Sequence, residues 1–220
     1  MSADLIQSGA GRYMMELAGL LAVFSFMIVA PGADTAMVLR QSLLHGRKAG
    51  IATSVGIGTA LLFHVSYTIL GIGLIVAQSL LLFAILKWAG ALYLIAMGVK
   101  ALRTPAMDLG GAGMNTPTIG MSNVKAFLIG FATNALNPKP VLFFLSLFSA
   151  LVSIETPAVV KIGYGLAMSS CLIAWFTAVS YFLTVPLVRA RFARAGRWIN
   201  RVTGAVFIGL GLKLAAAQAR

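Results

Sequence analysis

Long apolar segments, interrupted by short charged stretches, run along most of this 220-residue chain. A helix needs about 20 apolar residues to cross a bilayer. The longest uncharged run, residues 49–86, has 38 residues and must therefore hold two spans, with a turn expected at VAQSL, residues 76–80. Other apolar runs cover residues 17–39, 87–99, 126–154, 162–188 and 202–212. The pattern predicts about six transmembrane helices.

The composition supports the same class of protein. Hydrophobic residues make up 60% of the chain and charged residues only 10%, against about 25% charged residues in an average soluble domain. The sequence therefore predicts an all-α membrane protein in which most of each helix is solvated by lipid.

The charges predict an orientation in the membrane. The five connections between the expected spans carry three, none, three, one and five basic residues in chain order. Because Lys and Arg accumulate in cytoplasmic loops, the first, third and fifth connections should be cytoplasmic and both termini periplasmic. The fifth is an arginine-rich loop at residues 189–201. No basic face remains outside these loops, so the net charge of +12 does not indicate nucleic-acid binding.

One connection is long enough to divide the chain. Residues 103–124 are rich in Gly, Pro and Thr and have no apolar period. They predict a cytoplasmic linker between an N-terminal three-helix repeat, residues 1–102, and a C-terminal three-helix repeat, residues 125–220. Two three-helix units in series must face opposite ways across the membrane.

The two halves share short segments. FSFMIVAP (24–31) aligns with FATNALNP (131–138), and LKWAGALYLIAMG (86–98) aligns with NRVTGAVFIGLGL (200–212). Together with the opposite orientations of the halves, these matches predict two inverted repeats, a common construction of secondary transporters.

A proline breaks the first span of each repeat at a matched depth. Pro31, followed by Gly32, lies in the first half, and Pro138 lies in the second. Proline removes a backbone donor and frees the carbonyl one turn earlier. Lipid cannot satisfy such groups, so each break should line a cavity inside the protein. Paired interruptions in two halves point to a transport site.

Charged and amide side chains accompany both breaks. Asp34 could bind a substrate ammonium group and a proton in turn, or it could cap the helix that restarts after the break. Lys139 could bind a substrate carboxylate or pair with Asp34. Asn134 and Asn137 add donors and acceptors, although Asn137 could serve only as a helix cap.

The second span carries two further features. His64 lies mid-span, where it could relay protons or be a hydrogen-bonded core residue. Ala52, Gly56 and Ala60 recur every four residues and form a small-residue face suited to close helix packing. Such faces would also permit a homodimer.

Signatures of enzymes and cofactors are missing from the sequence. It contains no GxSxG, no HExxH and no P-loop. The single cysteine, Cys171, and the two histidines give no metal-ligand spacing. We expect no catalytic residues, no cofactor and no bound metal.

Three segments together resemble the LysE/RhtB superfamily of amino-acid exporters, of the homoserine, threonine and lysine efflux type. They are PGADTAMVLRQSLLHGRKAGIATSVGIGTALLFHVSYTILGIG, LKWAGALYLIAMGVKALR and FLIGFATNALNPKPVLFF, and the similarity extends over residues 17–213. The resemblance implies six spans in two inverted repeats, an inner-membrane location and export that uses the proton-motive force. The family's Pro-Gly-Pro-Asp box falls on residues 31–34, where Ala33 replaces the second proline.

The residues and the resemblance lead to one functional hypothesis. They predict an inner-membrane exporter of amino acids or close derivatives that works by proton antiport and alternating access. The ammonium group of a small zwitterionic substrate would face Asp34, and its carboxylate would face Lys139, Asn137 and a half-helix N-terminus. The alternatives are a metal or inorganic-ion exporter on a related fold and a membrane scaffold that transports nothing.

Overall fold

The computed structural model describes residues 3–30, 32–78, 80–105 and 121–216, and all regular secondary structure in this part of the chain is α-helical. The helices are α1 (Ala3–Val29), α2 (Ala33–His45), α3 (Arg47–Gln78), α4 (Leu80–Arg103), α5 (Asn123–Ala135), α6 (Pro138–Leu151), α7 (Ala158–Phe182) and α8 (Pro186–Ala216).

Helix breaks occur at both places that the sequence indicated. Between α1 and α2, Gly32 has an extended backbone, and Pro31 itself lies outside the described residues. Between α5 and α6, Asn137 caps the new helix by accepting a hydrogen bond from the backbone N–H of Lys139 at 3.0 Å. Pro138 is the first residue of α6, where its missing N–H removes no helical hydrogen bond.

The boundaries of the long helices confirm one expectation from the sequence and correct another. α3 ends at Gln78 and α4 begins at Leu80, within the expected turn at 76–80. The predicted arginine-rich loop at 189–201 is wrong, because α8 runs without a break from Pro186 to Ala216. Its Ala and Arg residues are good helix formers, and Pro186 suits a first helical turn.

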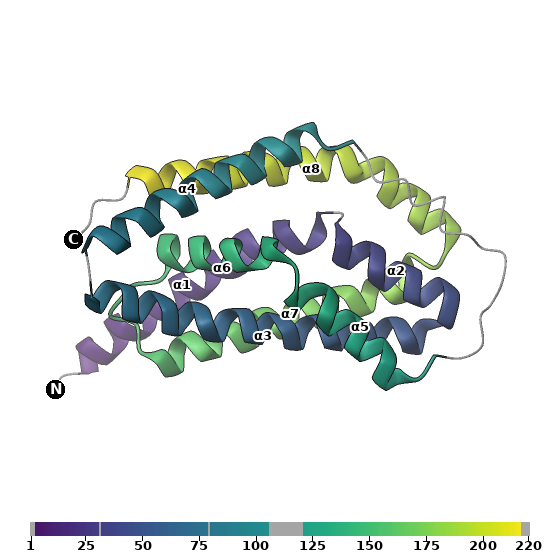
Figure 1. The fold of residues 1–220 in the computed structure, drawn as a ribbon, viewed down its shortest axis with the longest axis horizontal. Coiled ribbons are helices and arrows are strands. Elements are labelled where there is room, and N and C mark those ends of the chain that lie inside the picture. Colours follow the sequence, from purple (N-terminus) through teal and green to yellow (C-terminus); the bar gives the residue numbers. More distant parts are fainter. Residues whose placement is uncertain (1–2, 31, 79, 106–120, 217–220) are drawn as a thin grey trace.

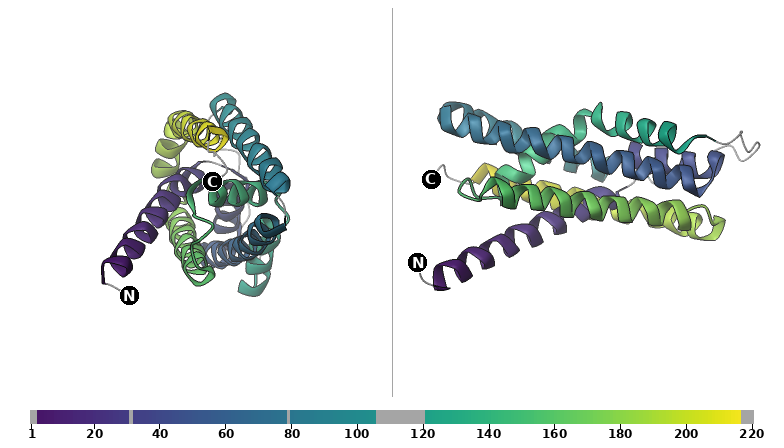
Figure 2. Two further views of the ribbon diagram at one scale, coloured as in Figure 1. Left: turned by 90° about the vertical axis from the view of Figure 1, so that its left-hand side faces the viewer. Right: turned by 90° about the horizontal axis from the view of Figure 1, so that it is seen from below.

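The helices form two groups (Figures 1 and 2). α4 and α8 lie side by side and run antiparallel, forming a pair that covers the remaining helices. Among those, α3 packs against α5 and α7, so helices from the two halves of the sequence interleave. α1 leans away from the bundle towards its N-terminal end (Figure 2). The connections α2–α3 and α7–α8 lie at the end of the molecule opposite to the start of α1 (Figure 1).

Small residues let α3 and α5 approach closely. A Cβ added to Gly56 would lie 2.1 Å from the carbonyl oxygen of Phe127 in α5, so no side chain fits there. Ala60, one turn further on, is fully buried, and Ala52 is half-buried. Because α5 of the same chain packs against Gly56, it occupies part of the small-residue face of α3 that could have served a homodimer.

Aromatic side chains fill the centre of the bundle. Phe24 of α1 contacts Phe144 of α6 with ring centroids 5.8 Å apart, and Phe143 contacts Phe207 of α8 at 5.4 Å. All four rings are buried. They hold α6, which begins at the second helix break, against helices of both groups.

A buried carboxylate ties α1 to the connection between α6 and α7. Glu16 accepts hydrogen bonds from the backbone N–H of Ser153, the hydroxyl of Thr156 and the phenol of Tyr164, at 2.9–3.0 Å. These contacts close the end of the bundle at which α1 begins.

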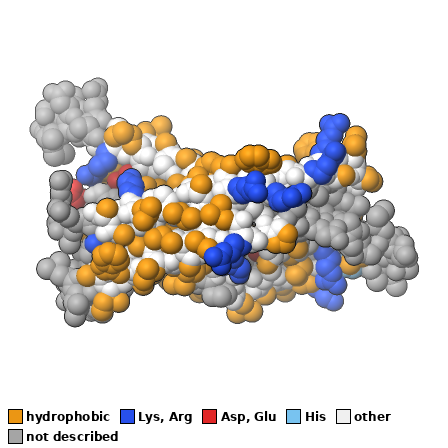
Figure 3. All heavy atoms as spheres, turned by 90° about the horizontal axis from the view of Figure 1, so that it is seen from above, with side chains coloured by type: hydrophobic (Ala, Val, Ile, Leu, Met, Phe, Trp, Pro, Cys, Tyr) orange, Lys and Arg blue, Asp and Glu red, His pale blue; other side chains and the backbone are white. Residues whose placement is uncertain are grey.

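The surface fits a lipid environment. By length and composition, four described segments could each cross a membrane: Gly9–Val29, Arg47–Gly71, Ala158–Phe182 and Pro186–Ala216. Many large apolar side chains are exposed, including Leu70, Leu128 and Leu166. On the face in Figure 3, orange apolar side chains dominate, and red acidic groups are few. The chain is a helical membrane protein.

Candidate functional site

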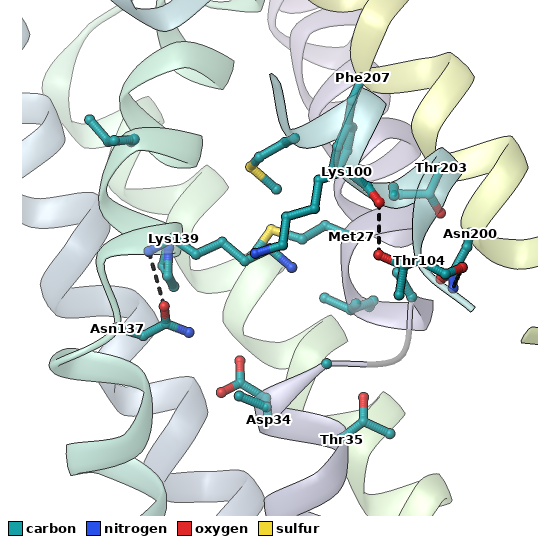
Figure 4. Close-up of a pocket in the computed structure, with 18 of the residues that line it drawn as sticks. Met27, Asp34, Thr35, Lys100, Thr104, Asn137, Lys139, Asn200, Thr203 and Phe207 are labelled. Carbon is teal, nitrogen blue, oxygen red and sulfur yellow. Dashed lines mark hydrogen bonds between the residues drawn. The ribbon is translucent and has the colours of Figure 1, made fainter. Parts of the chain in front are cut away.

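A cavity of about 700 Å³ lies where the two helix breaks meet the α4–α8 pair (Figure 4). The first break contributes Met27, Ile28, Ala30 and residues 32–35, and the second contributes Asn137, Lys139, Pro140 and Leu142. α7 adds two apolar side chains, Leu172 and Phe176. The α4–α8 side adds Tyr93, Ala96, Met97, Lys100, Ala101, Thr104, Asn200, Thr203 and Phe207. Residues more than 100 positions apart thus share one chamber.

Asp34 lies in the first turn of α2 and lines this cavity. Its Oδ2 atom accepts a hydrogen bond from Nδ2 of Asn134 at 2.9 Å. Its Oδ1 atom is buried without a partner among the described residues. The start of α2 has no side-chain cap, so Asp34 does not act as the cap that the sequence allowed. A buried carboxylate oxygen without a partner is costly, and a bound cation or a proton would satisfy it.

Asn134 and His64 form a layer behind Asp34, outside the cavity lining. Both side chains are buried. Nε2 of His64 lies 3.1 Å from the carbonyl oxygen of Asn134, and Nδ1 contacts the hydroxyl of Tyr67. Because a carbonyl only accepts, Nε2 carries the proton in this arrangement and Tyr67 donates to Nδ1. His64 therefore holds the end of α5, whose Asn134 holds Asp34.

Lys139 enters the cavity from the start of α6. It interacts electrostatically with Asp34 and with Lys100. Figure 4 shows the side chains of Lys139 and Lys100 extending towards each other from opposite walls, with Asp34 on a third side. Neither ammonium group has an ion pair or a hydrogen bond with the described residues. The cavity therefore offers two cations and one anion to a ligand.

Both half-helices begin at the cavity. Gly32, Ala33, Asp34 and Thr35, at the start of α2, line it, and so does Asn137, before α6. The N-terminus of a helix carries a partial positive charge and free N–H groups. At α2 no side chain caps these groups, so they remain available to a negatively charged ligand atom.

The structure brings together some of the expected site residues and separates others. Gly32, Asp34, Asn137 and Lys139 line the cavity, and Asn134 and His64 stand behind it. Pro138 begins α6, and Gly56 packs against α5 rather than at the cavity.

Sequence reasoning missed the α4–α8 wall of the cavity. Lys100 had been counted only as a basic residue of a cytoplasmic connection. Asn200 lies within the arginine-rich segment 189–201 that had been assigned to a loop, and Thr203 lies at the start of the expected span that follows it. The position of Asn200 on α8 became meaningful only once that segment was known to be helical. Tyr93 was visible as a polar group within a span, and its hydroxyl donates to the carbonyl of Lys139 at 3.0 Å.

Comparison with known families agrees with this architecture. The model of the LysE family, described as the LysE type translocator, matches residues 25–218. The chain belongs to the LysE family.

This LysE family protein is similar to several known proteins along most of their length. A threonine efflux protein of Salmonella typhi is 30% identical over 188 residues, which cover 85% of this chain and 91% of the relative. A homoserine/homoserine lactone efflux protein of Salmonella typhimurium is 28% identical over 204 residues, or 88% and 93%. The uncharacterised membrane protein YrhP of Bacillus subtilis is 27% identical over 208 residues, or 91% and 98%. No solved structure matches the chain.

Proposed function

We propose that this LysE family protein exports amino acids or close derivatives across the bacterial inner membrane, and that the cavity between the helix breaks is its substrate site. The observation that carries the proposal is the presence of a partnerless carboxylate oxygen, Asp34 Oδ1, in the same chamber as the ammonium group of Lys139. An amino acid has the complementary charges at its two ends. The efflux relatives support the same reading.

Each end of the substrate has a defined set of contacts in this proposal. The substrate ammonium group binds Oδ1 of Asp34, while Asn134 keeps Oδ2 fixed. The substrate carboxylate binds Lys139, assisted by the amide of Asn137 and by the free N–H groups at the start of α2. The side chain faces the mixed wall of α4 and α8.

Transport proceeds by alternating access between two inverted repeats, with six spanning units formed by α1–α2, α3, α4, α5–α6, α7 and α8. Glycines at matched positions support this symmetry. Gly58 of α3 and Gly165 of α7 are 107 residues apart, the same separation as between FSFMIVAP and FATNALNP. A Cβ on Gly58 would lie 2.4 Å from Ile173 of α7, and a Cβ on Gly165 would lie 2.8 Å from Val65 of α3.

The cavity faces the cytoplasm in this conformation. The lining reaches Thr104, just beyond the end of α4, and α4 runs towards the end of the molecule that carries the α2–α3 and α7–α8 connections (Figure 1). The opposite end is closed by the hydrogen bonds of Glu16. Basic residues near cytoplasmic helix ends support this orientation, with both termini in the periplasm.

Protons drive export by competing with the substrate for Asp34. A proton from the periplasm occupies the carboxylate, displaces the substrate ammonium group and leaves to the cytoplasm when the cavity reopens. The charged group that acts on Asp34 electrostatically is Lys139, whereas His64 is neutral in the arrangement described above. No cofactor takes part in this cycle.

The test is counterflow by purified protein in proteoliposomes. Vesicles loaded with unlabelled amino acids should accumulate the radiolabelled amino acid from outside, and an Asp34→Asn variant should not. Accumulation of a divalent cation instead would favour the ion exporter, and no exchange of either would favour the scaffold.

A further inference from the structure

The charged groups that line the cavity leave a net charge when a neutral amino acid is bound. Among the described residues that line the cavity, the side chains with a formal charge at neutral pH are Lys100, Lys139 and Asp34, which sum to +1. A zwitterion leaves this charge unchanged after it binds. Enclosing an uncompensated charge away from water is costly.

The neutral polar groups on the same wall are already occupied. The hydroxyl of Thr104 donates to the carbonyl of Lys100 at 2.7 Å, and that of Thr203 donates to the carbonyl of Phe26 at 3.2 Å. Nδ2 of Asn200 donates to backbone carbonyls at the end of α4. On the α4–α8 wall, the ammonium group of Lys100 is therefore the main donor that remains for a ligand.

The two lysines come from opposite walls and meet in the middle of the chamber. Lys139 extends from α6 and Lys100 from the last turn of α4 (Figure 4). Two like charges that approach each other in this way repel unless anions lie between or beside them. Asp34 supplies one negative charge, but in the proposed function this charge is used by the substrate ammonium group.

We propose that the substrate is an acidic amino acid, with one ammonium group and two carboxylates, and that Lys100 selects it by binding the second carboxylate. Lys139 binds the other carboxylate, and Asp34 binds the ammonium group. The sum of the charges in the loaded cavity is then zero. The inference rests on the proposed function, and it differs from the neutral substrates named for the threonine and homoserine efflux relatives.

Counterflow with defined amino acids tests the inference. Proteoliposomes of the full chain are loaded with L-aspartate, L-glutamate, L-threonine or L-homoserine, and the exchange rates are compared. The wild-type protein should exchange the acidic pair faster. Lys100→Gln should lower the ratio of aspartate to threonine exchange by about tenfold or more, because a charge-assisted contact is lost. Lys100→Arg should keep most of the preference.

Arg103→Gln is the matched control. Arg103 lies in the same last turn of α4 and carries the same charge, but it is exposed and does not line the cavity. This variant should keep the wild-type ratio. If Lys100→Gln fails to insert, the exchange rates of the four substrates with the wild-type protein decide whether the substrate is acidic.

The inference and the proposed function fail in different ways. Faster exchange of threonine or homoserine than of aspartate by the wild-type protein overturns the acidic substrate and leaves amino-acid export standing. An unchanged ratio in an inserted Lys100→Gln variant overturns the role of Lys100. Exchange of none of the four amino acids counts against both proposals.

Discussion

The amide of Asn134 donates to the carboxylate of Asp34 across 2.9 Å, although the two residues are 100 positions apart. Asp34 follows the first helix break, and Asn134 precedes the second. This hydrogen bond joins the two breaks and leaves one carboxylate oxygen free. It sets the geometry on which the proposed substrate site depends.

Replacement of Asn134 should impair transport more than folding. Asn134→Ala frees the carboxylate of Asp34 from its fixed orientation, and the loss of one hydrogen bond to a charged group should lower exchange by about tenfold or more. Counterflow in proteoliposomes measures the rate of exchange. Thr133→Ala is the control, because the Thr133 hydroxyl bonds only to its own helix. Equal effects of the two substitutions would contradict a specific role for Asn134.

His64 should act as a positioning residue rather than as a proton relay. Its ring is buried, does not line the cavity and holds the carbonyl of Asn134. His64→Gln should therefore lower the free energy of unfolding by about 1–3 kcal/mol. The pH at which transport is half-maximal should stay at the wild-type value. A displaced pH profile would restore the relay hypothesis.

Gly56 should not tolerate even a methyl group. Gly56→Ala forces α3 and α5 apart at Phe127, and we expect a loss of about 1–3 kcal/mol, measured as a lower melting temperature in detergent. Gly71→Ala on the same helix is the matched control, because nothing lies within 4 Å of a Cβ at Gly71. A similar melting temperature for both variants would disprove the close contact.

Cysteine labelling tests the orientation. Ala195→Cys lies on the basic first part of α8 and should react with a membrane-impermeant reagent only after the cells are permeabilised. Ala217→Cys, near the C-terminus, should react in intact cells. Cys171 is removed first as a background thiol. The opposite labelling pattern would invert the orientation and the direction of transport.

Local signals explain why the helix breaks were predictable. Proline, glycine and asparagine act within a few residues of themselves, so Gly32, Asn137 and Pro138 marked the breaks in the sequence. The turn before Leu80 followed from span length alone. Asp34 and Lys139 stood out because they are charged residues within otherwise apolar runs.

Contacts between distant helices could not be predicted in the same way. Lys100 looked like an orientation signal, and only the packing of α4 across the breaks places it in the cavity. No sequence pattern indicated that Thr156 and Tyr164 would donate to the carboxylate of Glu16. The arginine-rich segment was assigned to a loop because charge outweighed helix propensity in that reading.

The most direct test of the proposed substrate site is export driven by a pH gradient in proteoliposomes that contain Asp34→Asn. The substitution keeps the size of the side chain but removes its charge and its proton. Because the amide oxygen of the new side chain can still accept the hydrogen bond from Asn134, the variant should fold and insert. Gradient-driven export of amino acids should fall to background. Export at the wild-type rate with the wild-type pH dependence would contradict a role for Asp34 in binding either substrate or proton.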